Sequence, residues 1–97
     1  MGNPTHPSPT FPQYPGGAFT PSTTNGLGTR FVNPSNTAAY ITVVIYVGSA
    51  GNVQVITPSG DTVTFQGLLA GTVIPVQVVQ IVTGGTTAST AALVAIY

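Results

Sequence analysis

Apart from its tyrosines, this 97-residue chain has three titratable side chains: His6, Arg30 and Asp61. No Glu, Lys, Cys or Trp accompanies them. A serine–histidine–aspartate triad would have to combine His6, which lies among prolines, with Asp61, which lies in an expected turn. A general base must be held in a fixed geometry, and catalysis depends on clustered ionisable groups. We therefore expect no enzymatic activity.

Each of these residues also has a structural explanation. Asp61 closes the sequence Pro-Ser-Gly-Asp, in which an aspartate typically accepts hydrogen bonds from the backbone amides of a turn. Three His6 side chains could bind a metal if the N-terminal segments of a trimer converged, but a single histidine in a polar tail is usually solvated. Arg30 is expected to pair with a carboxylate or with backbone carbonyls. We expect no metal and no cofactor.

Two sequence patterns resemble binding motifs but lack the residues that complete them. The prolines between Pro4 and Pro15 give P-x-x-P spacings, which can dock into an aromatic-lined groove. No Arg or Lys flanks them, so an SH3-type ligand is not indicated. The glycine pairs are followed by neither a lysine nor a helix, so they do not predict a phosphate-binding loop.

The composition is typical of a protein that contacts other proteins. Charged residues make up 2% of the chain and hydrophobic residues 42%, whereas soluble domains carry about 25% charged residues. Zero net charge provides no long-range attraction for nucleic acid or anionic membranes. A nearly uncharged surface usually associates with itself or with its neighbours. The absence of cysteine excludes disulfides.

No targeting segment is predicted. The first ten residues lack the basic and apolar regions of a secretory signal. The longest strongly apolar stretch, Ile41 to Val47, is far shorter than the roughly 20 residues that a membrane helix needs. We expect a protein that is made in the cytoplasm and does not enter a membrane.

The chain is predicted to consist of an extended arm, residues 1–36, and a β domain, residues 37–97. Seven of the nine prolines fall in the first 36 residues, where they disfavour helices and central strands. A freely solvated tail would fit this composition. Spaced aromatic residues are unusual in such a tail, however, and they favour a strap that lies on a neighbouring surface. The aromatic residues of the arm are Phe11, Tyr14, Phe19 and Phe31.

The remaining sequence has the alternation of β-strands. Ile41, Val43, Ile45 and Val47 fall on one face of a first strand, and Val63 and Phe65 are expected to point inward from a strand that follows a hairpin turn. The outward positions are expected to be polar. The fold class is therefore all-β, a small antiparallel β-sandwich or partly open barrel of five to six short strands after the proline-rich arm. The expected strands are 39–47, 53–57, 62–66, 72–82 and 90–97.

Turn and break residues separate these strands. Gly60 and Asp61 end a tight turn that begins at Pro58, and Gly67 and Gly71 bound a second break. Pro75 lies inside the fourth strand, which predicts an edge position or a bulge. The alternation of that strand also slips between residues 78 and 81, which a bulge near residue 79 would correct. So small a domain is marginal alone, and we expect it to be an obligate oligomer.

The strand and turn residues resemble a known family. From Tyr46 to Gly48, the sequence gives a short Tyr-Val-Gly strand end, which Gly-Asp-Thr-Val-Thr-Phe follows at 60–65. An Ala-Gly-Thr step at 70–72, Pro75, a Gly-Thr-Thr turn at 85–87 and a closing strand at 93–97 complete the pattern. In these features the chain resembles the small spike-base and head-decoration proteins of tailed phages and gene transfer agents. It departs from the family in having Gln77 and Gln80 where relatives often carry arginines, and in its proline-rich arm.

The resemblance implies a structural virion protein on the outer surface of a capsid, assembled in the host cytoplasm. Its implied partners are the major capsid protein, further copies of itself as a homotrimer or homopentamer, and a spike or fibre protein. We expect Phe11, Tyr14, Phe19, Arg30 and Phe31 to contact the capsid or a neighbouring subunit. One alternative is a module that binds host-surface glycans through Tyr, Asn and Gln side chains. Another is a subunit of a self-assembling filament.

Overall fold

The structure, a computed structural model, describes residues 17–97. This part of the chain is all-β and contains nine strands and two 3-10 helices of three residues each. The elements are β1 Ala18–Phe19, β2 Val32–Asn33, β3 Asn36–Tyr40, β4 Val44–Val47, β5 Gly51–Ile56, β6 Thr62–Leu68, β7 Thr72–Val73, β8 Gln80–Val82, η2 Thr83–Gly85, η3 Thr90–Ala92 and β9 Leu93–Ile96.

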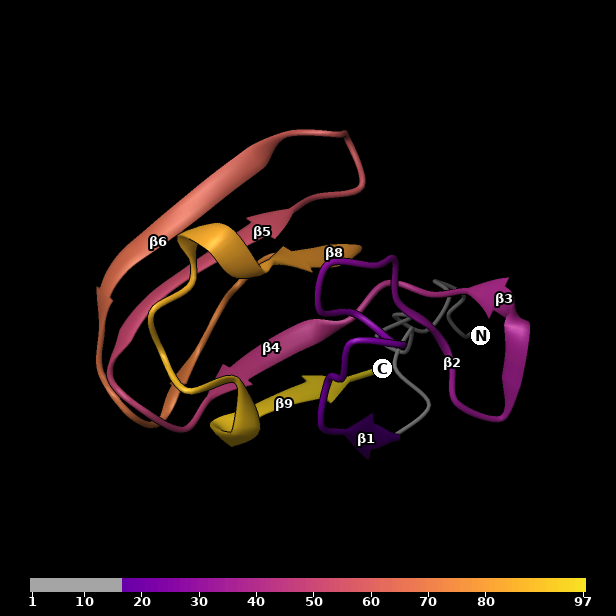
Figure 1. Cartoon of the computed structure of the whole chain (residues 1–97), viewed down its shortest axis with the longest axis horizontal. Helices are drawn as coiled ribbons and strands as arrows, with labels where there is room; N and C mark the ends of the chain where they lie inside the picture. Colours follow the sequence, from indigo (N-terminus) through magenta and orange to yellow (C-terminus); the bar gives the residue numbers. More distant parts are fainter. Residues whose placement is uncertain (1–16) are drawn as a thin grey trace, which may run out of the picture.

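Two antiparallel sheets enclose the core. One has four strands in the order β1-β9-β4-β7, and the other has three in the order β6-β5-β8. Figure 1 shows the three-stranded sheet above β4 and β9 of the four-stranded sheet, with the two-stranded β2-β3 hairpin projecting at one end. This arrangement confirms the expected all-β, sandwich-like fold.

The core is built by alternate residues of the facing strands. Val43, Ile45 and Val47 are fully buried, so the predicted inward face of the first strand is confirmed. Val63 and Phe65 are half-buried and pack against this core, also as predicted. Apolar side chains from both sheets therefore form one continuous cluster, whose other fully buried members are Phe31, Val53, Val55, Ile74, Val78, Ile81, Leu93 and Ala95.

The segment predicted as one long strand, 72–82, crosses between the two sheets. Its first part pairs with β4, since the amide of Ile74 donates to the carbonyl of Ile45 at 2.8 Å. Its second part pairs with β5, and the amide of Val79 donates to Ile56 at 2.8 Å. Val78 and Val79 are consecutive buried residues, so the expected irregularity near residue 79 is the point where the chain changes sheets.

The first strand is also interrupted. β3 ends at Tyr40, β4 begins at Val44, and Val43 between them forms an isolated bridge with Val78. Together with the short strands before residue 37, these interruptions account for nine strands where the sequence predicts five to six.

Residues 17–36 belong to the same body as the β domain, contrary to the prediction of an arm that reaches to residue 36. Gly17 and Tyr97 exchange backbone hydrogen bonds of 3.1 and 3.0 Å, and β1 continues this pairing along β9. The amide of Phe31 donates to Val79 at 2.8 Å, and its carbonyl accepts from Ile41 at 3.1 Å. The two prolines of this segment, at positions 21 and 34, leave enough backbone donors for these bonds.

Candidate interaction surface

The outward side of the four-stranded sheet is apolar. Across β7, β4 and β9, the registers align Val73, Tyr46 and Val94 in one row. In the next row Val44 of β4 is paired with Ile96 of β9, and Ile96 is paired with Ala18 of β1. Their strand neighbours Ile45, Val47, Leu93 and Ala95 point to the core, so these six side chains point away from it. We call these six residues the outer face.

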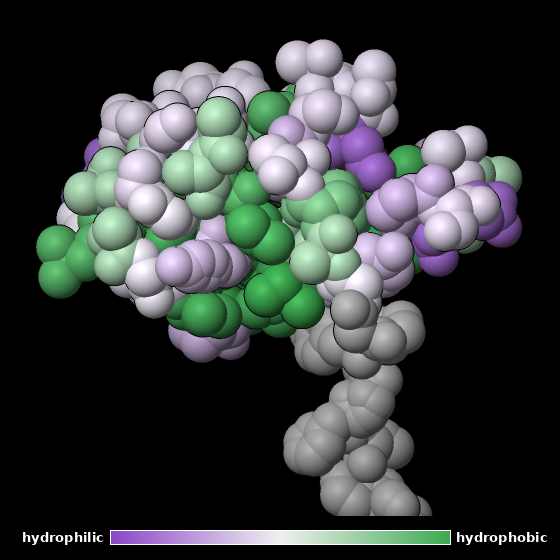
Figure 2. Space-filling model, turned by 90° about the horizontal axis from the view of Figure 1, so that it is seen from below, coloured by the Kyte–Doolittle hydropathy of each residue, from purple (hydrophilic) through white to green (hydrophobic). Residues whose placement is uncertain are grey.

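Exposed apolar residues lie in β7 and near it in the chain. Leu69 is 72% exposed, Val73 is 51% exposed and Val76 is 37% exposed. Figure 2 views the molecule from the side on which β1 and β9 lie in Figure 1 and shows apolar residues gathered across the middle of that side. Extended exposed apolar patches mark sites of contact with other molecules, whereas single exposed apolar residues are ordinary. In the outer face Ala18 and Val73 are exposed and the other four residues are partly exposed, so we take this face as the candidate functional site.

The three-stranded sheet differs from the four-stranded one. Thr62, Thr64 and Gln66 on β6 are exposed, and the side-chain amide of Gln54 donates to the Thr64 hydroxyl at 2.8 Å. The expectation of polar outward positions holds for this sheet and is wrong for the other. The signal was present in the sequence, since Val44, Tyr46, Val94 and Ile96 make both faces of their strands apolar.

Arg30 makes a contact that the sequence did not predict. Its guanidinium lies 4.7 Å from the centroid of the Tyr40 ring, a cation–π geometry, in place of the expected partner carboxylate or carbonyls. Both side chains are exposed, and Tyr40 is 68% exposed at the end of β3. Arginine stacks readily on aromatic faces because its planar cation is weakly hydrated. The pair presents the one arginine of the chain beside an aromatic ring.

Asp61 is a turn residue, as predicted, although its carboxylate is not bound by backbone amides. The amide of Gly60 donates to Thr57 at 2.9 Å, and the amide of Thr57 donates to the carbonyl of Asp61 at 2.9 Å. Gly60 has a φ of +93°, so the turn uses the left-handed conformation that glycine tolerates. The Asp61 carboxylate accepts a bond of 3.1 Å from the Ser59 hydroxyl. This geometry explains Asp61 by local structure.

The other predicted turn residues lie at irregular points of the backbone. Gly67, with a φ of +67°, donates its amide to the Asn52 side chain at 3.0 Å near a shift in the β5–β6 register. Gly71, with a φ of +93°, donates its amide to the carbonyl of Val47 at 2.7 Å and lies directly before β7. Pro75 follows β7, which is an edge strand of its sheet, as the sequence predicted.

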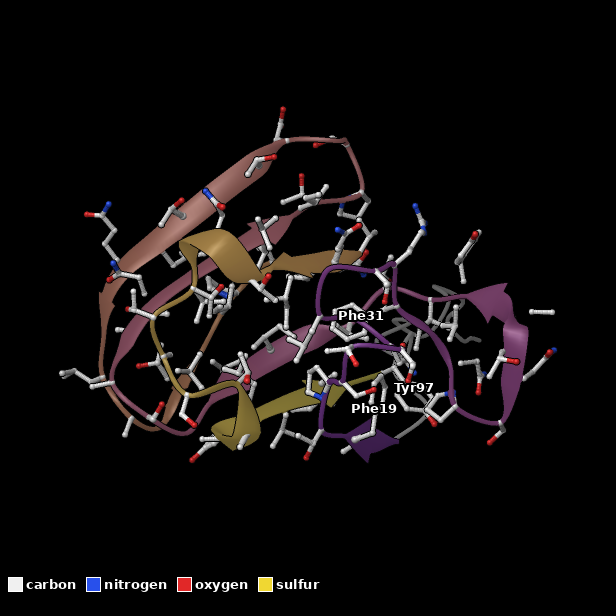
Figure 3. All side chains as sticks on the ribbon, viewed as in Figure 1. Phe19, Phe31 and Tyr97 are labelled. Carbon is white, nitrogen blue, oxygen red and sulfur yellow. The ribbon has the colours of Figure 1, made fainter. Side chains whose placement is uncertain are left out.

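Two aromatic residues predicted to contact a partner lie instead within the chain's own structure. Phe31 is fully buried, and its ring packs edge-on against Phe19 with the centroids 5.9 Å apart. Phe19 in turn packs against Tyr97 at 5.7 Å. Figure 3 shows the three rings close together between the N-terminal loop and the end of β9. Phe31 therefore anchors residues 17–36 to the body and cannot contact a second protein while the domain is folded.

Several predictions concern residues outside the described part of the chain. These are His6 and its metal site, the P-x-x-P prolines, and the anchors Phe11 and Tyr14. Within residues 17–97, no group of three or more His, Cys, Asp or Glu side chains is placed to hold a metal ion. The same residues include no helix with the length and apolar character needed to cross a membrane.

Comparison with protein-family models, with curated proteins and with solved structures found no match to this chain.

Proposed function

We propose that this protein is a structural component of a virion, located on the outer capsid surface of a tailed phage, where it acts as a spike-base or decoration (cement) protein. It binds the major capsid protein and stabilises the head or mounts a spike or fibre. The observation that carries this proposal is the outer face, an apolar sheet surface on a chain with one Arg and one Asp. The resemblance of residues 46–97 to spike-base proteins agrees with it.

Leaving such an apolar face in contact with water costs free energy. Burial of apolar surface contributes roughly 25 cal/mol per Å², and the outer face has apolar side chains in adjacent positions on four strands. No charged group of residues 17–97 belongs to it, so its association does not require an ion pair to be desolvated. Binding to the capsid should therefore be nearly insensitive to salt, unlike binding through charged patches.

A lysine substitution on the outer face tests the proposal. Val94→Lys places a charge in the middle of the face, at a half-exposed position where the long side chain can reach water. We expect the variant to fold and to lose binding to capsids in a cosedimentation assay. Thr83→Lys, at an exposed position in η2, adds the same charge elsewhere and should bind normally. Normal binding by Val94→Lys would contradict the proposal.

The residues before Gly17 provide a second test. Because residues 17–36 contribute to the core, a deletion that removes them would disturb the fold, so the informative deletion is residues 1–16. We propose that this segment, with Phe11 and Tyr14, contacts the capsid or a neighbouring subunit, as aromatic residues often do at interfaces. The truncated protein should bind capsids more weakly than the full chain at equal stability.

A host-glycan-binding role is the second candidate, and the exposed pair Arg30 and Tyr40 is the observation that favours it. An aromatic ring beside a cationic donor can stack on a sugar and hydrogen-bond its hydroxyls. A glycan array probed with the full chain and with Tyr40→Ala separates the candidates. Binding that depends on Tyr40 supports the glycan role, whereas the capsid proposal predicts no glycan signal.

A further inference from the structure

The edges of the two main sheets differ in how well they are protected. An unpaired edge exposes backbone donors and acceptors, and proteins protect such edges by shortness, proline, charge or a covering loop. β1 and β7 have only two residues each, and Pro75 lies just beyond β7. The outer edge of β8 is covered, because Ile81 accepts from Gly28 at 2.9 Å and donates to Gly26 at 2.8 Å. Three of the four edges are thus short or covered.

β6 is the fourth edge and, within the described residues, is neither short nor covered; its one irregularity is the register shift near Gly67, at its last residues. It has seven residues, Thr62 to Leu68, contains no proline or lysine, and pairs with β5 on one side only. Figure 1 shows it at the outer boundary of the molecule, with no strand beyond it. The one charge near it is Asp61, just before its first residue.

The backbone groups that point outward from β6 follow from the hydrogen bonds of β5. The amides of Asn52 and Gln54 donate to threonine hydroxyls at 2.8 and 3.1 Å, on the side of β5 away from β6. The alternate residues Val53 and Val55 therefore bond to β6, where their register partners are Phe65 and Val63. The backbone N–H and C=O groups of β6 that point outward therefore belong to the alternate residues Thr62, Thr64 and Gln66.

We propose that the β6 edge binds the β6 strand of a second copy of this chain, antiparallel and centred on Thr64. In this register Thr64 lies opposite Thr64 of the second copy, and Thr62 lies opposite Gln66. The three outward residues of each strand then exchange backbone hydrogen bonds, and the two three-stranded sheets join into one of six strands.

The side chains fit this register. Val63 of one copy lies opposite Phe65 of the other on the core side, where both are half-buried and gain further cover. Asp61 lies opposite Gly67, which has no side chain, and the two Asp61 carboxylates are about six residues apart along the strands, or roughly 20 Å. Thus the two acidic groups do not repel one another across the interface.

No other segment of the described chain, nor the sequence before it, is as well suited as β6 to pair with the β6 edge. The other edges of the two main sheets are too short or are covered, and β3 of the separate β2-β3 hairpin, with five residues, is shorter than β6. The residues before Gly17 carry too many prolines to supply a row of backbone donors. An interface of β6 with itself is two-fold, unlike the homotrimer or homopentamer that the family resemblance implies. It uses a surface separate from the outer face and does not depend on a capsid role.

A charge-swap experiment on the full chain tests the proposal. Thr64→Lys and Thr64→Glu each place like charges directly opposite one another in the β6 pair, and each replaces the hydroxyl that accepts a bond from Gln54. We expect each variant alone to have a dissociation constant for the dimer roughly fivefold higher or more than that of the unmodified protein, measured by sedimentation velocity. An equal mixture should form the mixed dimer at about the original affinity, because Lys then lies opposite Glu.

Hydrogen exchange of the unmodified protein gives a readout that needs no variant. The amides of Thr62, Thr64 and Gln66 should exchange more slowly as protein concentration rises, while those of Val63 and Phe65 are protected at every concentration. The amide of Val73 also points away from its sheet, since Ile74 next to it is the one bonded to β4, and it serves as an exchanging control. The proposal is wrong if the mixture does not recover dimerisation, if either variant dimerises normally, or if the Thr64 amide exchanges at a rate independent of concentration.

Discussion

Truncation of Phe31 tests whether residues 17–36 are an integral part of the domain. Phe31 is fully buried, contacts Phe19 edge-on, and makes one backbone hydrogen bond with each of two other segments, to Val79 and from Ile41. Phe31→Ala removes the ring from a core that surrounds it on all sides. If the segment were a separate arm, the same substitution would leave the stability of the domain unchanged.

The expected loss in free energy of unfolding follows from the complete burial of the Phe31 side chain. Replacement of a fully buried phenylalanine by alanine costs about 3 to 5 kcal/mol, which combines lost transfer free energy with a cavity. A domain of this size has a free energy of unfolding of roughly 5 to 10 kcal/mol, so the variant loses about half of it. At about 4 to 8 °C per kcal/mol, Tm should fall by roughly 15 °C or more. Phe31→Leu keeps most of the volume and should cost about 1 to 2 kcal/mol.

Urea and thermal unfolding, followed by circular dichroism at one fixed protein concentration, measure these differences. Fixed concentration matters because self-association stabilises the folded state by mass action. Phe19→Ala is a matched control, because Phe19 is half-buried on the rim of the same cluster and should cost less than Phe31→Ala. A Phe31→Ala variant within about 1 kcal/mol of the unmodified protein would refute the placement of Phe31 in the core.

Substitutions at three further positions have definite expected outcomes. Asn25→Ala removes two hydrogen bonds between the Asn25 side chain and the backbone of Val32, of 3.0 and 2.9 Å, and should lower the free energy of unfolding by about 1 to 3 kcal/mol in the urea assay. Asn25→Asp keeps the acceptor oxygen and loses the donor, so the same assay tests the donated bond separately. Gly26→Ala should destabilise the fold more than a typical substitution at the surface, because Gly26 has a φ of +103° and an added Cβ would overlap the buried Phe31 ring. An unchanged free energy of unfolding would contradict the packing of Phe31 against Gly26. Arg30→Ala should change stability by less than about 1 kcal/mol, since its contact with Tyr40 is exposed, and a larger loss would indicate a role that the structure does not show.

The sequence predicts those parts of the fold that local patterns determine. The β5–β6 hairpin follows from clean alternation and from a turn in which Pro58 and Gly60 occupy favourable positions. Pro75 marks an edge because a proline cannot donate to a neighbouring strand, and β7 is an edge strand. In each case one residue type fixes the local backbone whatever the rest of the chain does.

Other parts depend on contacts that are distant in the sequence. Proline density suggested that residues 1–36 form one arm, but β1 is held by β9 and Phe31 by Val79, both more than 40 residues away. The outer face likewise depends on contacts between distant segments. Which strands become neighbours, and therefore whether Tyr46 and Val94 form one patch, is decided by the sheet order and not by either strand alone.

The proposal that the chain works by binding a capsid through its outer face is tested most directly by imaging. Electron cryo-microscopy of capsids incubated with the full chain should show the β body on the capsid surface, with Val44, Tyr46 and Val94 turned toward the capsid protein. Capsids without added density, or a bound body whose outer face points into solvent, would contradict the account.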